Sequence, residues 1–472
     1  MRTLLWFKQD LRLDDHPAVR HAAESRCALP LYVLDTRLLE LAKSDRHRVG
    51  VHRARFLMEG LAALDGELRQ RGSRLLVLAG DPEVLIPQLV SQLALTEVVT
   101  LDEHVPSENQ RLERLRAKLG PAELRLYPAS TLGLLDGGLD GETPAISSFG
   151  RFVAEVDRLQ PTFQPLAAPG EMPPLPARSH DLFEPLPTLS QLGVGEPLAF
   201  ANSAFPFSGG EPAARAHLHD YLWKTGNVRR YEDEHELILG VEGSSKLAPW
   251  LAQGSLSPRR VAAELRRYEA QAGADASTRL LWRSLLWREF FACTLRRHGE
   301  SLFQTRGLKA TRNTPRGNDQ RFVSWCEGRT GVPLIDACMR ELASTGYLSH
   351  VARRIVASYL VRHLEQDWRL GAEWFEEHLL DYEPASNWGN WAFIAAAAVD
   401  PQRAASFNVM RQARRHDPQA EYVARWLPEL QSVPAELRHV PFLLNDTQRE
   451  SLRYPYLQDI PADWRPFMPT AA

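Results

Sequence analysis

Two patterns of apolar residues divide this chain of 472 residues. In residues 1–130, short apolar runs alternate with amphipathic stretches, whereas from Phe205 onward apolar residues recur at helical spacing almost throughout. Strands that alternate with helices favour a doubly wound parallel sheet, because each parallel strand needs a crossover connection. The first pattern therefore predicts an α/β domain, and the second predicts an all-helical domain.

Five apolar runs in the first part have the length of buried strands. No Gly-x-Gly-x-x-Gly motif follows the first run, which argues against a dinucleotide site of the Rossmann kind. The expected strands are residues 4–7, 29–34, 75–78, 98–101 and 124–127, with helices at 53–71 and 82–95.

Between the two patterns, residues 131–205 are rich in Pro, Gly, Ser and Ala. Such a composition is typical of a connector, here with one short helix at 147–159. We therefore expect an α/β domain at 1–130, a long linker at 131–205 and a helical domain at 206–472.

Two helices of the last part carry clear boundary signals. Ser257 followed by Pro258 predicts a helix start, because serine caps the first turn and proline fits its first position. Pro333 predicts a second start, and Gly346 predicts the end of that helix.

Composition limits the class of protein. The chain is 44% hydrophobic and 24% charged, as globular proteins are, and no apolar run is long enough to cross a bilayer. Its four cysteines form no C-x-x-C pair, so neither a zinc site nor a disulfide framework is indicated. No signal-peptide pattern is present, and we expect a cytoplasmic protein. A net charge of −3 argues against a coat of nucleic acid but allows a local basic face.

The most distinctive run is residues 381–391, which combines carboxylates, amides and two tryptophans. Burying Asn387 beside tryptophan is costly unless a polar group pairs with its amide. A flavin ring would supply that group.

A second run, residues 243–250, is small and rich in hydroxyl groups and leads into a helix. Exposed backbone N–H groups and the positive end of the helix dipole would suit a phosphate there. An ordinary helix cap is the alternative interpretation of the Gly-Ser-Ser sequence.

These runs, together with residues 6–15, resemble the cryptochrome/DNA photolyase family over nearly the whole chain. Residues 205–211 and 407–413 resemble its cryptochrome DASH group in particular. The resemblance implies the photolyase architecture, in which the helical C-terminal domain binds one FAD noncovalently. It also allows a second, antenna cofactor, a folate such as methenyltetrahydrofolate, with Glu103 as its contact.

The resemblance also assigns cofactor and electron-transfer residues. It implies that Arg353 and Asp381 pair against the flavin ring and that Asn387 faces flavin N5. The remaining FAD positions are Tyr231, Ser244, Ser245, Lys246, Leu247 and Glu383. Electron transfer is assigned to Trp391 and Trp368. The family's third tryptophan position holds Pro315, so the outer end of this chain is expected to be absent or rerouted through Trp374 or Trp388.

On the substrate side, the resemblance makes Trp287 the residue that stacks on an extruded base. Ser284 stands where dimer-repairing members have a glutamate, and His350 stands where they have asparagine. Members that repair (6-4) photoproducts carry a histidine there as proton donor. Arg354 and Phe393 also depart from the usual residues. This cluster of changes predicts altered substrate choice or loss of repair.

The function implied is a light-dependent DNA photolyase that transfers an electron from photoexcited reduced FAD to a pyrimidine dimer, preferentially in single-stranded DNA. A blue-light photoreceptor without repair activity and a (6-4) photolyase remain alternatives. We expect a monomer whose basic face gives salt-dependent DNA binding. The candidate phosphate contacts are Lys309, Arg312, Arg316, Arg411, Arg414 and Arg415.

Overall fold

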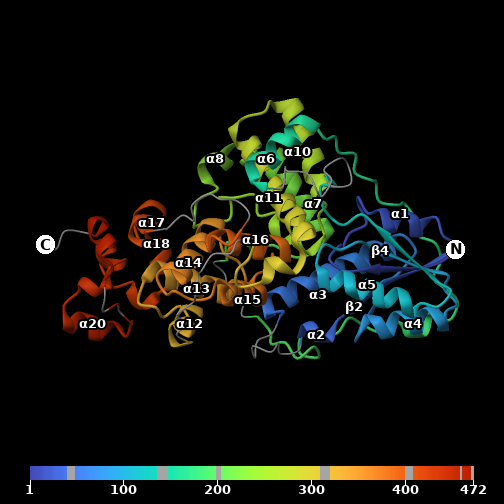
Figure 1. The fold of residues 1–472 in the computed structure, drawn as a ribbon, viewed down its shortest axis with the longest axis horizontal. Coiled ribbons are helices and arrows are strands. Elements are labelled where there is room, and N and C mark those ends of the chain that lie inside the picture. Colours follow the sequence, from blue (N-terminus) through green and yellow to red (C-terminus); the bar gives the residue numbers. More distant parts are fainter. Residues whose placement is uncertain are drawn as a thin grey trace.

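The structure is a computed structural model that describes residues 1–39, 48–134, 147–197, 203–308, 319–398, 408–455, 457 and 460–468. An α/β half lies near the N terminus, and a helical half extends from it to the C terminus (Figure 1). This arrangement confirms the predicted fold class.

Within the described residues, the strands form one parallel sheet in the order β3-β2-β1-β4-β5. Each prediction of a strand is confirmed to within two residues. The strands are β1 (Arg2–Phe7), β2 (Cys27–Leu34), β3 (Leu76–Ala79), β4 (Glu97–Leu101) and β5 (Glu123–Tyr127).

Side chains of β1 alternate between two cores, as the period of a strand requires. Leu4 and Trp6 join one apolar cluster with residues of α4 (Pro82–Gln92) and α5 (Pro106–Lys118). Leu5 and Phe7 join another with residues of α1 (Pro17–Ala23) and α3 (Val51–Gln70). Helices therefore cover both faces, and the sheet is doubly wound.

The connector carries one α-helix in its described part, α6 (Phe149–Leu159), where the sequence predicts it. The helical half follows. Its longer helices are α7 (Glu211–His219), α10 (Pro258–Ala272), α11 (Ala276–His298), α12 (Asp319–Cys326), α13 (Pro333–Thr345), α14 (His350–Arg362), α15 (Trp368–His378), α16 (Pro384–Ile394) and α17 (Val409–His416). Its shorter helices are η3 (Asp220–Lys224), η4 (Asn227–Arg230), α8 (Tyr231–Glu234), α9 (Ala248–Gln253), η5 (Gly299–Phe303), α18 (Glu421–Trp426), η6 (Pro428–Leu430), α19 (Ala435–Arg438), η7 (Pro441–Leu443), α20 (Asp446–Leu452) and η8 (Ala462–Phe467). Two short helices precede these, α2 (Thr36–Leu39) and η2 (His180–Leu182).

Helix boundaries follow the local signals. The Ser257 hydroxyl accepts the backbone N–H groups of Arg259 and Arg260 and so caps α10. Pro333 opens α13, and Gly346 ends it with φ +70°, a left-handed conformation that favours glycine. Both predicted starts are confirmed.

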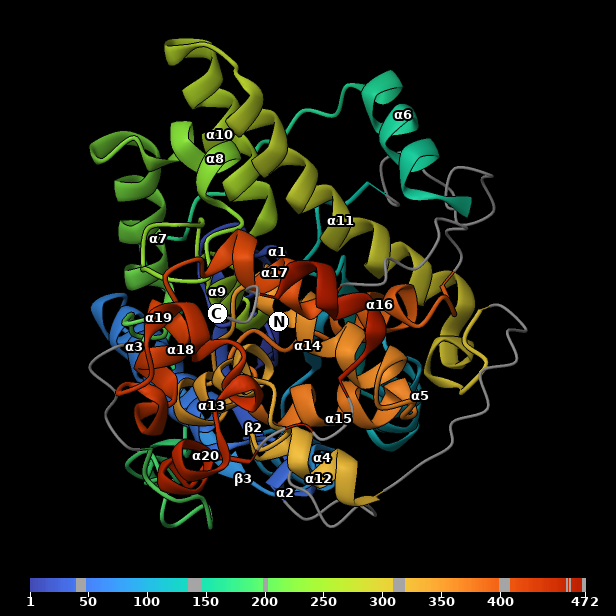
Figure 2. The ribbon, with the colours of Figure 1, turned by 90° about the vertical axis from the view of Figure 1, so that its left-hand side faces the viewer.

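Helix α11 organises the helical half. It packs against α16 on one side and against α6, α8 and α10 elsewhere. Figure 2 shows α6 beside the long α11, away from the α/β half. In the described ranges, no helix combines the length and apolarity that a membrane span needs.

Candidate functional site

Arg353, in the first turn of α14, forms an ion pair with Asp381, as predicted. Arg353 Nη2 donates to Asp381 Oδ2 at 2.9 Å, and its Nε donates to the Leu348 carbonyl at 2.8 Å. The other carboxylate oxygen, Asp381 Oδ1, is buried and has no hydrogen-bond partner within the described part of the chain. A buried acceptor without a donor is costly, so this oxygen fits an N–H group of a bound ligand.

Helix α16 places Asn387 in the same interior. Glu383 caps this helix, with its two carboxylate oxygens accepting from Ala385 N at 3.0 Å and Ser386 N at 2.8 Å. One turn later, Asn387 is only 8% exposed, and its Nδ2 donates to the Ala372 carbonyl at 3.0 Å. The amide is therefore held in one orientation, as a contact to a flavin ring requires.

The segment before α9 supplies a buried cation. Lys246 is 5% exposed, and its Nζ donates to the hydroxyl of Tyr347 at 3.2 Å and lies 4.7 Å from the centre of that ring. A diphosphate would add a charge-assisted hydrogen bond to this ammonium. Ser244 and Ser245 are half-buried beside Lys246, and Leu247 is buried. Tyr347 was not predicted as a site residue.

We call Arg353, Asp381, Asn387 and Lys246 the flavin side. It offers an unpaired buried acceptor, an oriented amide and a buried ammonium. These groups fit FAD: Arg353, Asp381 and Asn387 would hold the ring, and Lys246 would hold the diphosphate.

The two predicted electron-transfer tryptophans are both buried, each 2% exposed. The Trp391 ring lies 5.1 Å from Phe375 and 6.3 Å from Trp325. Trp368 meets Trp388 edge-on at 5.6 Å, whereas Trp374 stacks on His378. Of the two exits considered, this ring contact favours Trp388. Pro315 lies outside the described residues.

We call Ser284, Trp287, His350 and Arg354 the base side. Ser284 is exposed, and its hydroxyl donates to the Leu280 carbonyl at 3.0 Å and lies 3.2 Å from the hydroxyl of Tyr231. Tyr231, one of the predicted FAD positions, therefore contacts the base side through Ser284. Burial raises the pKa of the Tyr231 phenol. Serine offers no carboxylate at this position.

His350, the first residue of α14, lies where the site opens to solvent. Desolvation by the surrounding protein, together with the positive charges of Arg354 and Arg353, lowers the pKa of His350. The imidazole is therefore neutral at physiological pH.

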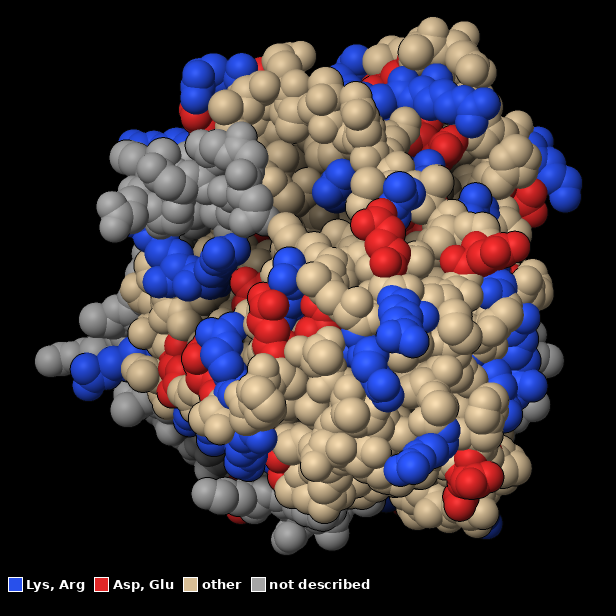
Figure 3. All heavy atoms as spheres, turned by 90° about the vertical axis from the view of Figure 1, so that its right-hand side faces the viewer, with Lys and Arg blue, Asp and Glu red and all other residues tan. Residues whose placement is uncertain are grey.

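Exposed arginines lie near this opening on α17, which packs against α14. Arg415 Nη2 pairs with Glu236 at 2.5 Å, and Arg414 Nη2 donates to the Met468 carbonyl at 3.0 Å. Arg411 is exposed on the same helix, whereas Lys309, Arg312 and Arg316 lie outside the described residues. On the face around the N terminus, by contrast, positive and negative side chains are intermixed (Figure 3).

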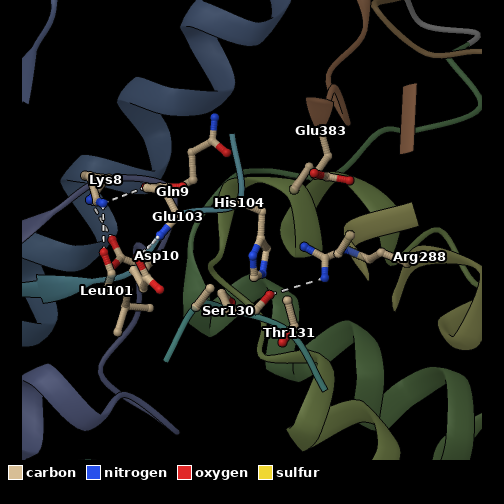
Figure 4. Close-up of a pocket in the computed structure, with 14 residues that line it drawn as sticks. Lys8, Gln9, Asp10, Leu101, Glu103, His104, Ser130, Thr131, Arg288 and Glu383 are labelled. Atoms are coloured by element: carbon tan, nitrogen blue, oxygen red, sulfur yellow. Dashed lines mark hydrogen bonds and ion pairs between the residues drawn. The ribbon is translucent and has the colours of Figure 1, made fainter. Parts of the chain in front are cut away.

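A separate, small cavity of about 60 Å³ lies between the two halves, partly open to solvent. It is lined by Lys8 and Glu103, which follow β1 and β4 and pair at 2.6 Å, and by Arg288 and Glu383 of the helical half. The His104 ring points into its middle (Figure 4), and both ring nitrogens are buried without a partner among the described residues. Burial lowers the pKa of His104. Sequence reasoning named Glu103 but missed His104 and Arg288.

Comparison with known proteins agrees with this geometry. A family model described as the FAD binding domain of DNA photolyase matches residues 280–463, and one described as DNA photolyase matches residues 3–159. A cryptochrome DASH from Gloeobacter violaceus is 39% identical over 93% of this chain and 88% of its own length. Another, from Synechocystis sp., is 36% identical over 95% and 91%.

Solved structures are similar as well. The crystal structure of a Synechocystis sp. cryptochrome matches with a TM-score of 0.90 and 33% identity, over 97% of this chain and 96% of that chain. A bacterial class III photolyase from Agrobacterium tumefaciens matches with a TM-score of 0.81 and 26% identity, over 96% and 93%.

The chain therefore belongs to the cryptochrome/DNA photolyase family of flavoproteins. Within that family, its curated relatives place it in the cryptochrome DASH group. FAD is the cofactor of its helical half.

Proposed function

We propose that this chain is a monomeric, light-dependent DNA photolyase that acts on UV-induced pyrimidine dimers, preferentially in single-stranded DNA. When bound and reduced, FAD supplies, on absorbing blue or near-UV light, the electron that splits the dimer. The chain's own residues would hold the cofactor, receive the extruded lesion and bind the DNA backbone.

The adjacency of the flavin side and the base side supports this proposal most. Trp287 is half-buried on α11, and its ring lies 6.0 Å from Phe393 of α16. Helix α16 also carries Asn387, and the two helices pack together. A base stacked on Trp287 and the flavin ring would therefore both lie against the packed pair of helices α11 and α16.

Each remaining residue has a stated task in this proposal. Arg353 keeps a positive charge in the buried site, which favours an electron-rich, negatively charged flavin ring. Trp391 and Trp368 would return electrons to the site from the protein surface. Arg411 and its neighbours on α17 would contact phosphates, since such contacts position a strand without reading its sequence.

Preference for single strands follows from the cost of extrusion. A base must leave its stack to reach Trp287, which costs a few kcal/mol in duplex DNA and less where pairing is already lost. Stacking on one tryptophan returns roughly 1–3 kcal/mol per base.

A blue-light photoreceptor is the second candidate, and Ser284 favours it. The Ser284 hydroxyl is already bonded to the Leu280 carbonyl and lies beside Tyr231, so no carboxylate stabilises a reduced dimer at this position. The (6-4) alternative needs a protonated His350, which the neighbouring positive charges of Arg354 and Arg353 disfavour.

One assay separates these functions. The reduced, FAD-loaded protein is irradiated with single- and double-stranded oligonucleotides that each carry one defined lesion, and restored bases are counted against a dark control. We expect restoration of pyrimidine dimers, mainly in single strands. If no lesion is restored under light, the repair proposal fails and the photoreceptor stands.

We further propose that the cavity between the halves binds an antenna folate. It lies at the carboxyl ends of β1 and β4, where the connections diverge to opposite sides of the sheet, and ligands of α/β sheets bind at such points. A bound folate would offer hydrogen bonds to the His104 ring nitrogens, which have no partner among the described residues, and Glu103 would accept from the pterin. Titration with methenyltetrahydrofolate tests this: Glu103→Gln should weaken binding, and equal binding by both proteins would count against Glu103.

A further inference from the structure

The ring expected to receive a base is already covered by another ring. Phe149, the first residue of α6, stacks on Trp287 with ring centres 3.6 Å apart and planes 11° apart. Phe149 is only 5% exposed and belongs to the hydrophobic core of the helical half, although its helix lies in the connector. Its helix, α6, packs against α11.

This spacing leaves no room for a base between the two rings. Aromatic carbons in contact are already about 3.5–4 Å apart, so an inserted base would need twice the gap. Phe290 and Phe393 meet the indole edge-on at 5.8 Å and 6.0 Å, and Phe291 meets it at a tilt. The flat face covered by Phe149 is thus the one that already accepts a stacked ring.

We infer that Phe149 is a gate residue: it occupies the stacking face of Trp287, and an extruded base must displace it. This inference rests on the proposed function, because the proposed function requires an extruded base to stack on Trp287. Phe149 acts on substrate choice by setting how readily a base reaches that face.

The anchoring of α6 allows this movement. Phe152 and Val156, on the following turns, are 0% and 1% exposed and hold the helix in place. Phe149 lies at the first helical position, where Ser148 caps the turn through a bond of 3.4 Å to Arg151 N. A change of the Phe149 side chain therefore does not require α6 to unfold.

Arg283 connects the gate to the DNA backbone. Its guanidinium carbon lies 5.6 Å from the centre of the Phe149 ring, and the side chain is exposed one turn before Trp287. A phosphate that draws Arg283 toward solvent would remove this cation–π contact from the closed gate.

The gate makes base binding an exchange of one stacked ring for another. A base that must first leave a duplex stack gains little from this exchange, whereas a base that is already unstacked gains the most. Phe149 therefore sets a fixed cost that every base must offset to occupy this face of Trp287, and a base that is already unstacked offsets it most readily.

The test compares Phe149→Ala with the wild type, both full-length and FAD-loaded, in equilibrium binding to single-stranded oligonucleotides with and without one thymine dimer. Removing the competing ring should tighten binding roughly two- to tenfold, the range of one aromatic pair. The gain should be no larger for the undamaged strand, because both strands displace the same ring. The gain should also vanish in a Trp287→Ala background.

Phe152→Leu is the matched control, because Phe152 is buried on the same helix and contacts Phe290 at 5.6 Å. It should leave affinity unchanged. Acrylamide quenching of tryptophan fluorescence gives a readout without DNA: Phe149→Ala should expose one more quenchable tryptophan, and Phe149→Ala combined with Trp287→Phe should not.

Unchanged or weaker binding by Phe149→Ala, or a gain that persists without Trp287, overturns the gate and leaves the proposed function intact. If the wild type and all variants bind no oligonucleotide, the proposed function itself fails, and the gate fails with it.

Discussion

The flavin side and the base side lie next to each other but are built differently. On the flavin side, Asn387 and Lys246 are 8% and 5% exposed, and the Asp381 side chain is 6% exposed. On the base side, Ser284 and His350 are exposed, and Trp287 is half-buried. The flavin side is therefore part of the core, whereas the base side lies at the protein surface beside the core.

This difference bears on the departures that the family resemblance implies at Ser284 and His350. A change on the flavin side leaves a buried charge or amide unpaired, which costs several kcal/mol. A change at exposed positions such as Ser284 and His350 costs little stability, because water replaces the lost contacts. Substrate choice can therefore change on the base side while the cofactor site stays intact.

The largest effect is expected on the flavin side. Asp381→Ala leaves the Arg353 guanidinium without its carboxylate, and breaking a buried pair costs about 3–5 kcal/mol. Affinity for FAD should fall by more than about 100-fold. Flavin absorbance per polypeptide after gel filtration, and FAD titration of the stripped protein, measure this loss.

The matched control breaks a pair on the surface. Glu24→Ala removes an ion pair of the same kind from Arg20, with side chains 59% and 69% exposed. It should change FAD binding by nothing measurable and stability by at most about 0.5 kcal/mol. Normal FAD affinity in Asp381→Ala would show that FAD binding does not depend on the buried ion pair of Arg353 and Asp381.

A second effect concerns pH. Glu341 is 2% exposed on α13, and burial is the main cause that raises its pKa from 4.5 to about 7, against a hydrogen bond from Tyr422 and the charge of Lys246. Between pH 4.5 and about pH 7, the Glu341 carboxyl keeps its proton in the folded protein, whereas in the unfolded chain it has released it. Stability should therefore fall as pH rises from about 4.5 to about 7, by about 3 kcal/mol.

Glu341→Gln removes this titration and keeps an acceptor for the Tyr422 hydroxyl. The free energy of unfolding, measured by denaturant at pH 5 and at pH 8, should fall with pH in the wild type. In the variant this fall should be smaller by nearly the same amount. The variant should be the more stable protein at pH 8. Parallel pH profiles of the two proteins would mean that Glu341 titrates normally.

A third change tests the contact between the two regions. An added Cβ at Gly389 of α16 would lie 2.2 Å from the Phe291 ring of α11, which neighbours Trp287. Gly389→Ala should destabilise the protein by about 1–3 kcal/mol in denaturant unfolding. Gly66→Ala in α3 is the matched control, because no atom lies within 4 Å of the added Cβ, and it should stabilise by up to about 1 kcal/mol. Equal effects at the two glycines would refute the tight contact.

Sequence reasoning succeeded where the determining signal is local. Strand β1 is set by a run of apolar residues, and α10 by the adjacent Ser257 and Pro258. The ion pair of Arg353 and Asp381 also could be predicted, but from the family resemblance rather than from spacing.

The stack of Phe149 on Trp287 could not be predicted in this way. Its two residues lie far apart in sequence, on a connector helix and a core helix, and Phe149 alone is an ordinary buried aromatic residue. The burial of the His104 ring, whose nitrogens find no hydrogen-bond partner in the part of the chain that the structure describes, depends likewise on how the two halves meet. Such features arise from tertiary packing, for which a short run of sequence carries no signal.

The smallest expected effect lies at the outer rim of the base side. Arg411 is exposed on α17, and the proposed phosphate contact would release about 0.7 counterions from a single strand. Arg411→Gln should therefore lower the salt dependence of binding by about 0.7 in log–log slope. It should leave the ratio between damaged and undamaged strands unchanged, because a phosphate contact reads no base. Arg20→Gln, on the α/β half, is the control and should change neither quantity. A changed lesion ratio in Arg411→Gln would move Arg411 from the backbone-binding rim into the base side itself.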